Sequence, residues 1–282
     1  MSRWLGSALS GQRLRVELRP ASVRVVRKVA FPRSRAVPAR PIAVDPEPSS
    51  QEEPLQPWSA TVDALGLALR EQRGRLPPVE LVLSDHFVRY LLIPWSDGLV
   101  GDSERLAFAH LAFRDLHGQL ADAWQLCLDE QPAGQASLGC AVDQALPSAL
   151  HEVVARAGGK LVSLTPTLAD CINRHRSALK APEFCFVAAE PGRISLAFHS
   201  RSGWQAVRSR RIDGPLPENL PTLLKQETAV GGATGGGMLY VCVDAMPDMS
   251  PFAVPGWRMA FLAEGRYATR PASDPELVAA GS

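Results

Sequence analysis

Apolar and charged residues alternate along residues 13–31, with a turn at residues 19–22. The alternating apolar positions are Leu14, Val16, Leu18, Val23 and Val25, followed after a change of phase by Val26 and Val29. A period of two is typical of strands that bury one face. The pattern therefore predicts a β-hairpin near the start of the chain.

Short apolar runs and stretches with helical spacing follow from residue 59 onwards. Strands are predicted at residues 79–83, 87–93, 123–129, 137–142 and 160–164, and helices at residues 59–73, 147–157 and 166–179. Asp102 or Ser103 is expected to cap the N-terminus of a further helix, because both residue types are preferred at that position. Its predicted inward positions are Leu106, Ala109, His110, Phe113 and Leu116.

A second block with a similar order begins at residue 184. Its predicted elements are a strand at residues 185–188, a hairpin of residues 194–199 and 204–210, a helix at residues 217–228 and a strand at residues 238–243. Because hairpins precede helices twice, we expect a mixed α/β protein with two related halves. The first half is expected over residues 13–180, and a reduced second half over residues 181–268.

The remaining segments have the composition of loops and tails. Prolines recur among acids and serines in residues 32–57, which predicts a loop or linker. Residues 1–12 are expected to form a basic tail, and residues 269–282 a frayed polar tail. No run approaches the ~20 apolar residues of a membrane helix, and the N-terminal segment matches a signal peptide poorly. We therefore expect a cytoplasmic chain.

Composition and motifs argue against common chemistries. The 282 residues carry a formal net charge of +1, so no overall field favours nucleic acid. The five cysteines form no CxxC pair and are expected to be buried thiols in a reducing compartment. Residues 231–237 are rich in glycine but lack the lysine of a P-loop, and Asp85-His86 is interpreted as a hairpin turn. No catalytic residue and no metal ligand is predicted.

Three segments carry a resemblance to a known family. They are residues 16–26 (VELRPASVRVV), residues 81–95 (LVLSDHFVRYLLIPW) and residues 159–176, which begin GKLVSLTP and end NRHR. They resemble the opening hairpin, the first-half strand pair and the step between the halves in PilM-like and GspL-like proteins, which are cytoplasmic actin-like components of type IV pilus and type II secretion machines. The resemblance extends over residues 13–245. It implies a two-lobed actin-like fold with ribonuclease H-like halves, mixed sheets flanked by helices, and a reduced second half.

The nucleotide loops of this chain depart from those of ATP-binding members of the fold. Those members carry an Asp and, two residues later, a Gly in the first hairpin, where Glu17, Arg19 and Pro20 stand here. The Cβ and long side chain of Arg19 would then occupy the phosphate position, and Pro20 lacks the backbone N–H that could bind a phosphate oxygen. In the second hairpin Ala188 replaces the Asp, and Glu190 occupies the tight turn. Asp244 stands where a Gly-Gly pair would admit adenosine. Three altered loops predict that no nucleotide cofactor is used.

Arginines dominate the N-terminal segment, where Glu17 is the one acid in residues 1–40. One interpretation is a solvated strand face with a loose tail. The other is peripheral contact with anionic lipids through Arg13, Arg15, Arg24, Arg27 and Lys28. RNA is disfavoured, since few aromatic residues lie among these charges. A second basic group, Arg208, Arg210 and Arg211, is expected on the exposed side of an edge strand.

These observations predict a non-catalytic scaffold, a pseudo-ATPase that binds the cytosolic tail of an inner-membrane protein. The resemblance implies a PilN-like or GspL/GspM-like partner and a cytoplasmic chain that is peripheral at the inner membrane. Two alternatives stay open. One is an actin-superfamily phosphotransferase or ATPase such as a sugar kinase, which the altered loops disfavour. The other is a generic α/β interaction domain.

Overall fold

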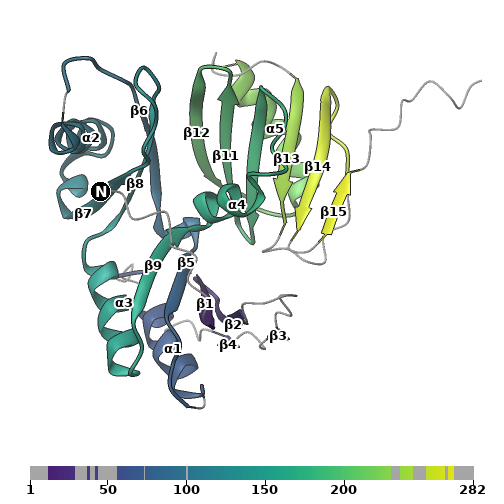
Figure 1. Cartoon of the computed structure of the whole chain (residues 1–282). Coiled ribbons are helices and arrows are strands. Elements are labelled where there is room, and N and C mark those ends of the chain that lie inside the picture. The colour runs from purple at the N-terminus through teal and green to yellow at the C-terminus, as the bar shows by residue number, and fades with distance from the viewer. Residues whose placement is uncertain are drawn as a thin grey trace, which may run out of the picture.

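The computed structural model shows two lobes side by side, joined by a central helix (Figure 1). It describes residues 12–28, 37–38, 42–43, 56–72, 74–99, 101–229, 236–243, 252–263 and 266–269. No helix within these residues is long and apolar enough to cross a membrane.

The first lobe is built on a mixed sheet. Its strands are β1 (Arg13–Arg19), β2 (Ser22–Lys28), β3 (Val37–Pro38), β4 (Ile42–Ala43), β5 (Val79–Leu83) and β9 (Leu161–Pro166). The order is β3-β2-β1-β5-β9, with β4 also paired to β2. The hairpin β1–β2 is antiparallel, whereas β5 and β9 run parallel to β1. The alternating apolar residues of β1, all essentially buried, pack against helices α1 (Ser59–Arg70) and α3 (Ala145–Arg156).

The second lobe repeats this plan. Its strands are β10 (Phe184–Glu190), β11 (Arg193–Ser200), β12 (Gly203–Arg211), β13 (Gly237–Cys242), β14 (Trp257–Ala263) and β15 (Arg266–Thr269), in the order β12-β11-β10-β13-β14-β15. The hairpin β10–β11 is antiparallel, and β13 runs parallel to β10. Helix α5 (Leu216–Ala229) packs on one face of this sheet, and α4 (Thr167–His175) packs on the other. The predicted boundary between residues 180 and 181 falls between α4 and β10.

A third, smaller sheet is inserted between β5 and β9. Its strands are β6 (Arg89–Ile93), β7 (Trp124–Leu128) and β8 (Ser137–Asp143), in the order β6-β8-β7. Helix α2 (Asp102–His117), followed by the short 3-10 helix η2 (Gly118–Ala123), covers it and buries Ala109 and Phe113. Strand β6 faces β12 of the second lobe (Figure 1). A second 3-10 helix, η1 (Asp85–Phe87), joins β5 to β6.

Most predicted elements are confirmed, including both hairpins. The proline-rich segment 32–57 is more than a loop, because β3 and β4 within it add to the first sheet. The strand predicted from residue 87 begins at Arg89, because η1 precedes it. Strands β14 and β15 were not predicted. The tails 1–11 and 270–282 and the glycine-rich residues 230–235 lie outside the described residues.

The prediction for α2 was wrong in two respects. Its N-cap is Gly101, whose N–H donates to the Glu104 carboxylate at 3.3 Å. The helix also turns a narrower face inward than expected, since Leu116 is 62% exposed and His110 is exposed. The third sheet is small, so it covers only the strip around Ala109 and Phe113.

Candidate functional site

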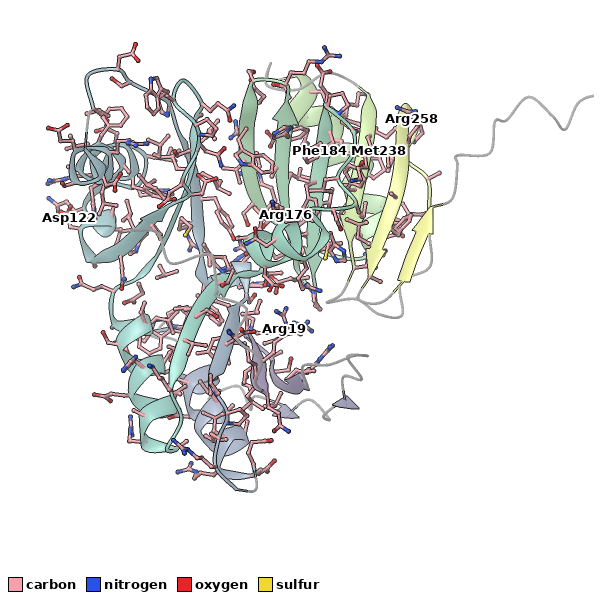
Figure 2. All side chains as sticks on the ribbon, viewed as in Figure 1. Arg19, Asp122, Arg176, Phe184, Met238 and Arg258 are labelled. Carbon is pink, nitrogen blue, oxygen red and sulfur yellow. The ribbon has the colours of Figure 1, made fainter. Side chains whose placement is uncertain are left out.

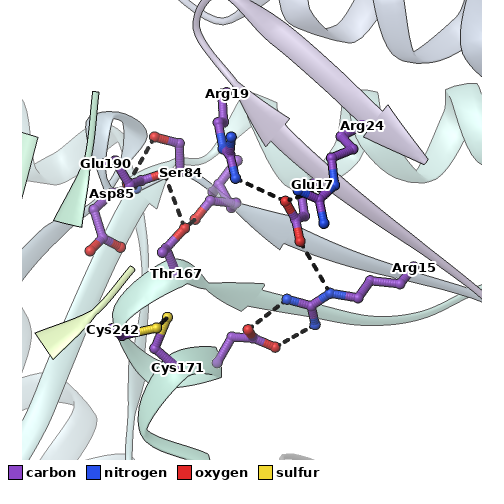
Figure 3. Close-up of polar contacts among 12 residues, drawn as sticks. Arg15, Glu17, Arg19, Arg24, Ser84, Asp85, Thr167, Cys171, Glu190 and Cys242 are labelled. Atoms are coloured by element: carbon purple, nitrogen blue, oxygen red, sulfur yellow. Dashed lines mark hydrogen bonds and ion pairs between the residues drawn. The ribbon is translucent and has the colours of Figure 1, made fainter. Parts of the chain in front are cut away.

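The first candidate site lies at the junction of the two lobes, where β1 meets helix α4. Arg15 donates two hydrogen bonds to the Asp170 carboxylate, at 2.6 and 2.7 Å (Figure 3). Arg174 donates a third to the same carboxylate at 2.7 Å. Both Arg15 and Asp170 are buried. Burial opposes the charge of Arg15, but its hydrogen bond to Asp170 and their attraction raise the pKa of the guanidinium overall. Burial likewise opposes the charge of Asp170, yet the arginines lower the pKa of its carboxyl.

Glu17 of β1 gathers further arginines at the same junction. Its carboxylate lies 2.9 Å from Arg19, 3.5 Å from Arg15 and 3.7 Å from Arg24 (Figure 3). Arg19 is the last residue of β1 and lies between the lobes (Figure 2). The structure therefore brings together Glu17 and Arg19, while Pro20 forms part of the exposed β1–β2 turn.

The cavity at this junction is small. Its volume is about 20 Å³, and its walls include Arg15, Glu17, Arg19, Thr167, Asp170, Cys171, Ala189 and Cys242. A cavity of this size has room for about one water molecule and none for a nucleotide. Side chains thus fill the position where the two hairpin turns of the lobes approach each other.

The second hairpin contributes Glu190, which was predicted to occupy the tight turn. That prediction was wrong: Glu190 is the last residue of β10, and the turn consists of Pro191 and Gly192. The Glu190 carboxylate accepts hydrogen bonds from the Asp85 N–H at 2.8 Å and from the Ser84 hydroxyl at 3.2 Å (Figure 3). It also accepts one from the Thr167 hydroxyl at 3.3 Å. The hairpin of the second lobe is thereby attached to the first. Ala188 is buried like its neighbours, and its side chain packs in the hydrophobic core of the second lobe.

Asp85 was interpreted as part of a hairpin turn, and this was also wrong. It is buried in η1, where its carboxylate accepts from the Tyr90 hydroxyl at 2.6 Å and from the Leu168 N–H at 3.3 Å. Burial raises the pKa of Asp85. Burial and then the neighbouring Asp85 charge raise the pKa of Glu190 to about 8. Both carboxyl groups are therefore shifted toward their protonated forms.

Two cysteines lie behind this cluster. The Sγ atoms of Cys171 on α4 and Cys242 on β13 are 2.8 Å apart, and both residues are buried. Asp244, the third position predicted to be an altered loop, lies outside the described residues.

A second candidate site is a groove beside the third sheet. It has a volume of about 300 Å³ and lies between strands β7–β8, helix α4 and β12. Its apolar lining comes from Tyr90, Leu128, Leu138, Ala169, Ile172 and Trp204. Another cavity of about 300 Å³ opens beside α2, and residues 127–131 line both. This groove was not predicted from the sequence, because its walls come from elements distant in the chain.

Ion pairs with acidic residues engage several arginines of the basic patch that was predicted near the N-terminus. Arg13 binds Glu80 at 2.5 Å, and Arg15 is only 4% exposed, so Arg15 is not available to a lipid headgroup. The side chains of Arg27 and Lys28 lie outside the described residues. The expected group of Arg208, Arg210 and Arg211 is divided. The first two bind Glu227 of α5 at 3.0 and 3.2 Å, whereas Arg211 lies on the opposite face of the strand.

No protein-family model and no curated protein matches this sequence. Several solved structures are similar to the fold. The PilM-PilN type IV pilus biogenesis complex superimposes with a TM-score of 0.58 and 14% identity, over 83% of this chain and 82% of the matched one. The cytoplasmic domain of EpsL, an inner-membrane component of the type II secretion system of Vibrio cholerae, gives 0.52 and 14%, over 93% and 91%.

A third similar structure is a protein of unknown function with an actin-like ATPase fold from Bacteroides thetaiotaomicron. Its TM-score is 0.55 at 10% identity, over 83% of this chain and 82% of that one. These likenesses confirm the predicted two-lobed actin-like fold. They also bear out the structural resemblance to PilM and to the EpsL cytoplasmic domain.

Proposed function

We propose that this actin-like chain is a non-catalytic scaffold of a type IV pilus or type II secretion assembly. It acts in the cytoplasm, at the inner membrane, and binds the cytosolic tail of an inner-membrane protein. The groove between β7–β8 and α4 is the observation that carries this proposal. The likeness to PilM, which was solved with PilN, and to EpsL, an inner-membrane component, supports it.

The groove suits an extended peptide. Its lining is mainly apolar, with Leu128 and Ile172 on opposite walls. Strand β7 is the edge strand of its sheet and pairs only with β8 among the described strands. Edge strands can accept a further strand through main-chain hydrogen bonds, while side-chain pockets supply specificity. A tail of about five residues would match the length of β7, at ~3.3 Å per residue.

The proposal includes a pseudo-ATPase. Support comes from the junction, where the Arg15–Asp170 and Arg19–Glu17 pairs leave only about 20 Å³. Backbone N–H groups and glycine normally cradle a phosphate, so space is required as well as charge. Here Glu190 places a carboxyl group next to the second hairpin turn and uses it to attach the lobes.

Photo-crosslinking in cells tests the groove. Ile172, in the groove wall, would be replaced by p-benzoylphenylalanine, and the matched control would carry it at Glu152, an exposed position on α3. We expect the Ile172 variant alone to crosslink an inner-membrane protein with a short cytosolic segment. Identical products from both positions, or none from Ile172, would exclude this groove as the docking site.

Washing membranes with salt separates two modes of attachment. Contacts between apolar groups in the groove should persist to ~0.5 M salt, whereas contacts of lipid with basic residues such as the half-buried Arg24 should be lost as the Debye length shrinks. If cells that lack the pilus and secretion proteins retain the chain on membranes equally well, tail binding is wrong.

A further inference from the structure

Two arginines of the second lobe lie directly opposite each other. Arg193 opens β11 and Arg211 ends β12, and they are register partners in the antiparallel pair. The Ile212 N–H donates to the Gly192 carbonyl at 3.1 Å, so the neighbouring Arg193–Arg211 pair is a non-hydrogen-bonded one. Such pairs are the closer kind, with Cα atoms about 4.5 Å apart. Like charges in this position destabilise a sheet.

A third arginine, from the inserted sheet, lies near the Arg193–Arg211 pair. Arg89 is the first residue of β6, which packs against β12. Burial and then repulsion from Arg89 lower the pKa of Arg193, and burial and then Arg211 lower the pKa of Arg89. His86 stands beside them, with its Nε2 3.0 Å from the Pro191 carbonyl oxygen.

The charges of these arginines are not neutralised by ion pairs. Within the described residues, no carboxylate lies within 4.0 Å of Arg89, Arg193 or Arg211. Arg193 is only 7% exposed, and it donates to the Ser209 hydroxyl at 2.8 Å. Its buried Nε has no hydrogen-bond partner. A buried cation without an anionic partner is disfavoured, so the site has unused capacity for an anion.

The acids whose charges act on Arg193 are already engaged. Asp85 accepts from Tyr90 and Leu168, and Glu190 accepts from Ser84, Asp85 and Thr167. The raised pKa of each carboxyl also favours its neutral form, which leaves the positive charge less compensated.

We propose that Arg89, Arg193 and Arg211 form a binding site for a phosphoryl group. Guanidinium groups bind phosphate oxygens through paired, charge-assisted hydrogen bonds. Arg193 supplies the buried end of the site, and the exposed Arg89 and Arg211 flank its mouth. The site lies at the β12 edge of the second sheet, whereas the filled junction lies at β10 and β13. It is therefore separate from the nucleotide position of the fold, and it does not depend on the proposed scaffold role.

Titration with inorganic phosphate tests the proposal directly. Melting temperature and calorimetric binding would be measured at constant ionic strength, with chloride exchanged for phosphate. We expect phosphate to stabilise the chain, and Arg211→Gln and Arg89→Gln each to weaken binding about tenfold or more. Both side chains are exposed, so the variants should fold. Arg210→Gln is the matched control, because Arg210 lies on the other face and binds Glu227.

Vesicles identify the source of the phosphoryl group. Binding to vesicles of phosphatidylcholine with phosphatidic acid, lost in Arg211→Gln, would assign the site to a lipid headgroup. Phosphate binding without vesicle binding would assign it to a small phosphorylated molecule. The proposal is overturned if phosphate gives no stabilisation, or if Arg211→Gln and Arg210→Gln respond alike. That result would mean that Arg193 is compensated internally by Asp85.

Discussion

Arg15 of β1 and Asp170 of α4 form a bidentate ion pair, with N···O distances of 2.6 and 2.7 Å. Helix α4 also packs on the sheet of the second lobe through Leu168 and Cys171. The pair therefore anchors the first sheet to the element that joins the lobes.

Removing one partner of this pair should be costly, because the other charge would remain buried. Arg15→Ala or Asp170→Asn is expected to lower the free energy of unfolding by about 3–5 kcal/mol, measured by urea denaturation. Replacing both residues by leucine should cost less than the two single changes together. The control Arg156→Ala breaks an exposed pair with Glu152 and should cost less than about 1 kcal/mol. Similar losses at both sites would contradict the structural role.

Stability should depend on pH through Glu190. Its folded pKa of about 8 lies above its ordinary value of 4.5, so between these limits the folded state binds more protons than the unfolded state. The free energy of unfolding should therefore fall as pH rises through this window, by up to about 1.4 kcal/mol per pH unit. In Glu190→Gln this slope should be largely lost, as urea denaturation at pH 5.5, 6.5 and 7.5 would show. Glu152→Gln, on an exposed helix face, should keep the slope.

ATP with magnesium should not raise the melting temperature. A ligand at ~100 times its dissociation constant would add about 2.7 kcal/mol to stability, so binding would be easily detected. Arg19→Gly removes one side chain from the junction, but the Arg15–Asp170 pair remains in place. That variant is therefore also expected to show no response, and a clear shift in either protein at millimolar ATP would refute the pseudo-ATPase proposal.

Thiol reactivity should report the burial of the cysteines. Cys171, Cys185 and Cys242 are buried, while Cys127 and Cys140 are half-buried. With Ellman's reagent, at most these two half-buried thiols should react in the native chain, and all five in denaturant. Cys127→Ser should remove the faster native reaction, since burial raises the pKa of the Cys140 thiol. Immediate reaction of every thiol in the native state would be incompatible with this packing.

Local pattern was sufficient for much of the secondary structure. The alternation of Leu14, Val16 and Leu18 predicted β1, because a strand exposes successive side chains to opposite faces. The departure of Glu17 and Arg19 from the residues of ATP-binding members is likewise a prediction from the sequence alone, because a glycine is recognised by its missing side chain. By contrast, β14 was missed: most of its residues are buried, so it shows little alternation of polar and apolar positions.

The contacts that define the sites were decided by tertiary structure. Glu190 reads locally as a turn residue, yet its carboxylate is held by Ser84 and Asp85, more than a hundred positions earlier. Arg193 and Arg211 become neighbours only through the register of β11 and β12, and Arg89 joins them because β6 packs against β12. Periodicity and residue type act over a few residues and so determine strands and helices. The packing of distant segments, by contrast, determines which side chains are buried together and which charged groups lie next to one another at a site.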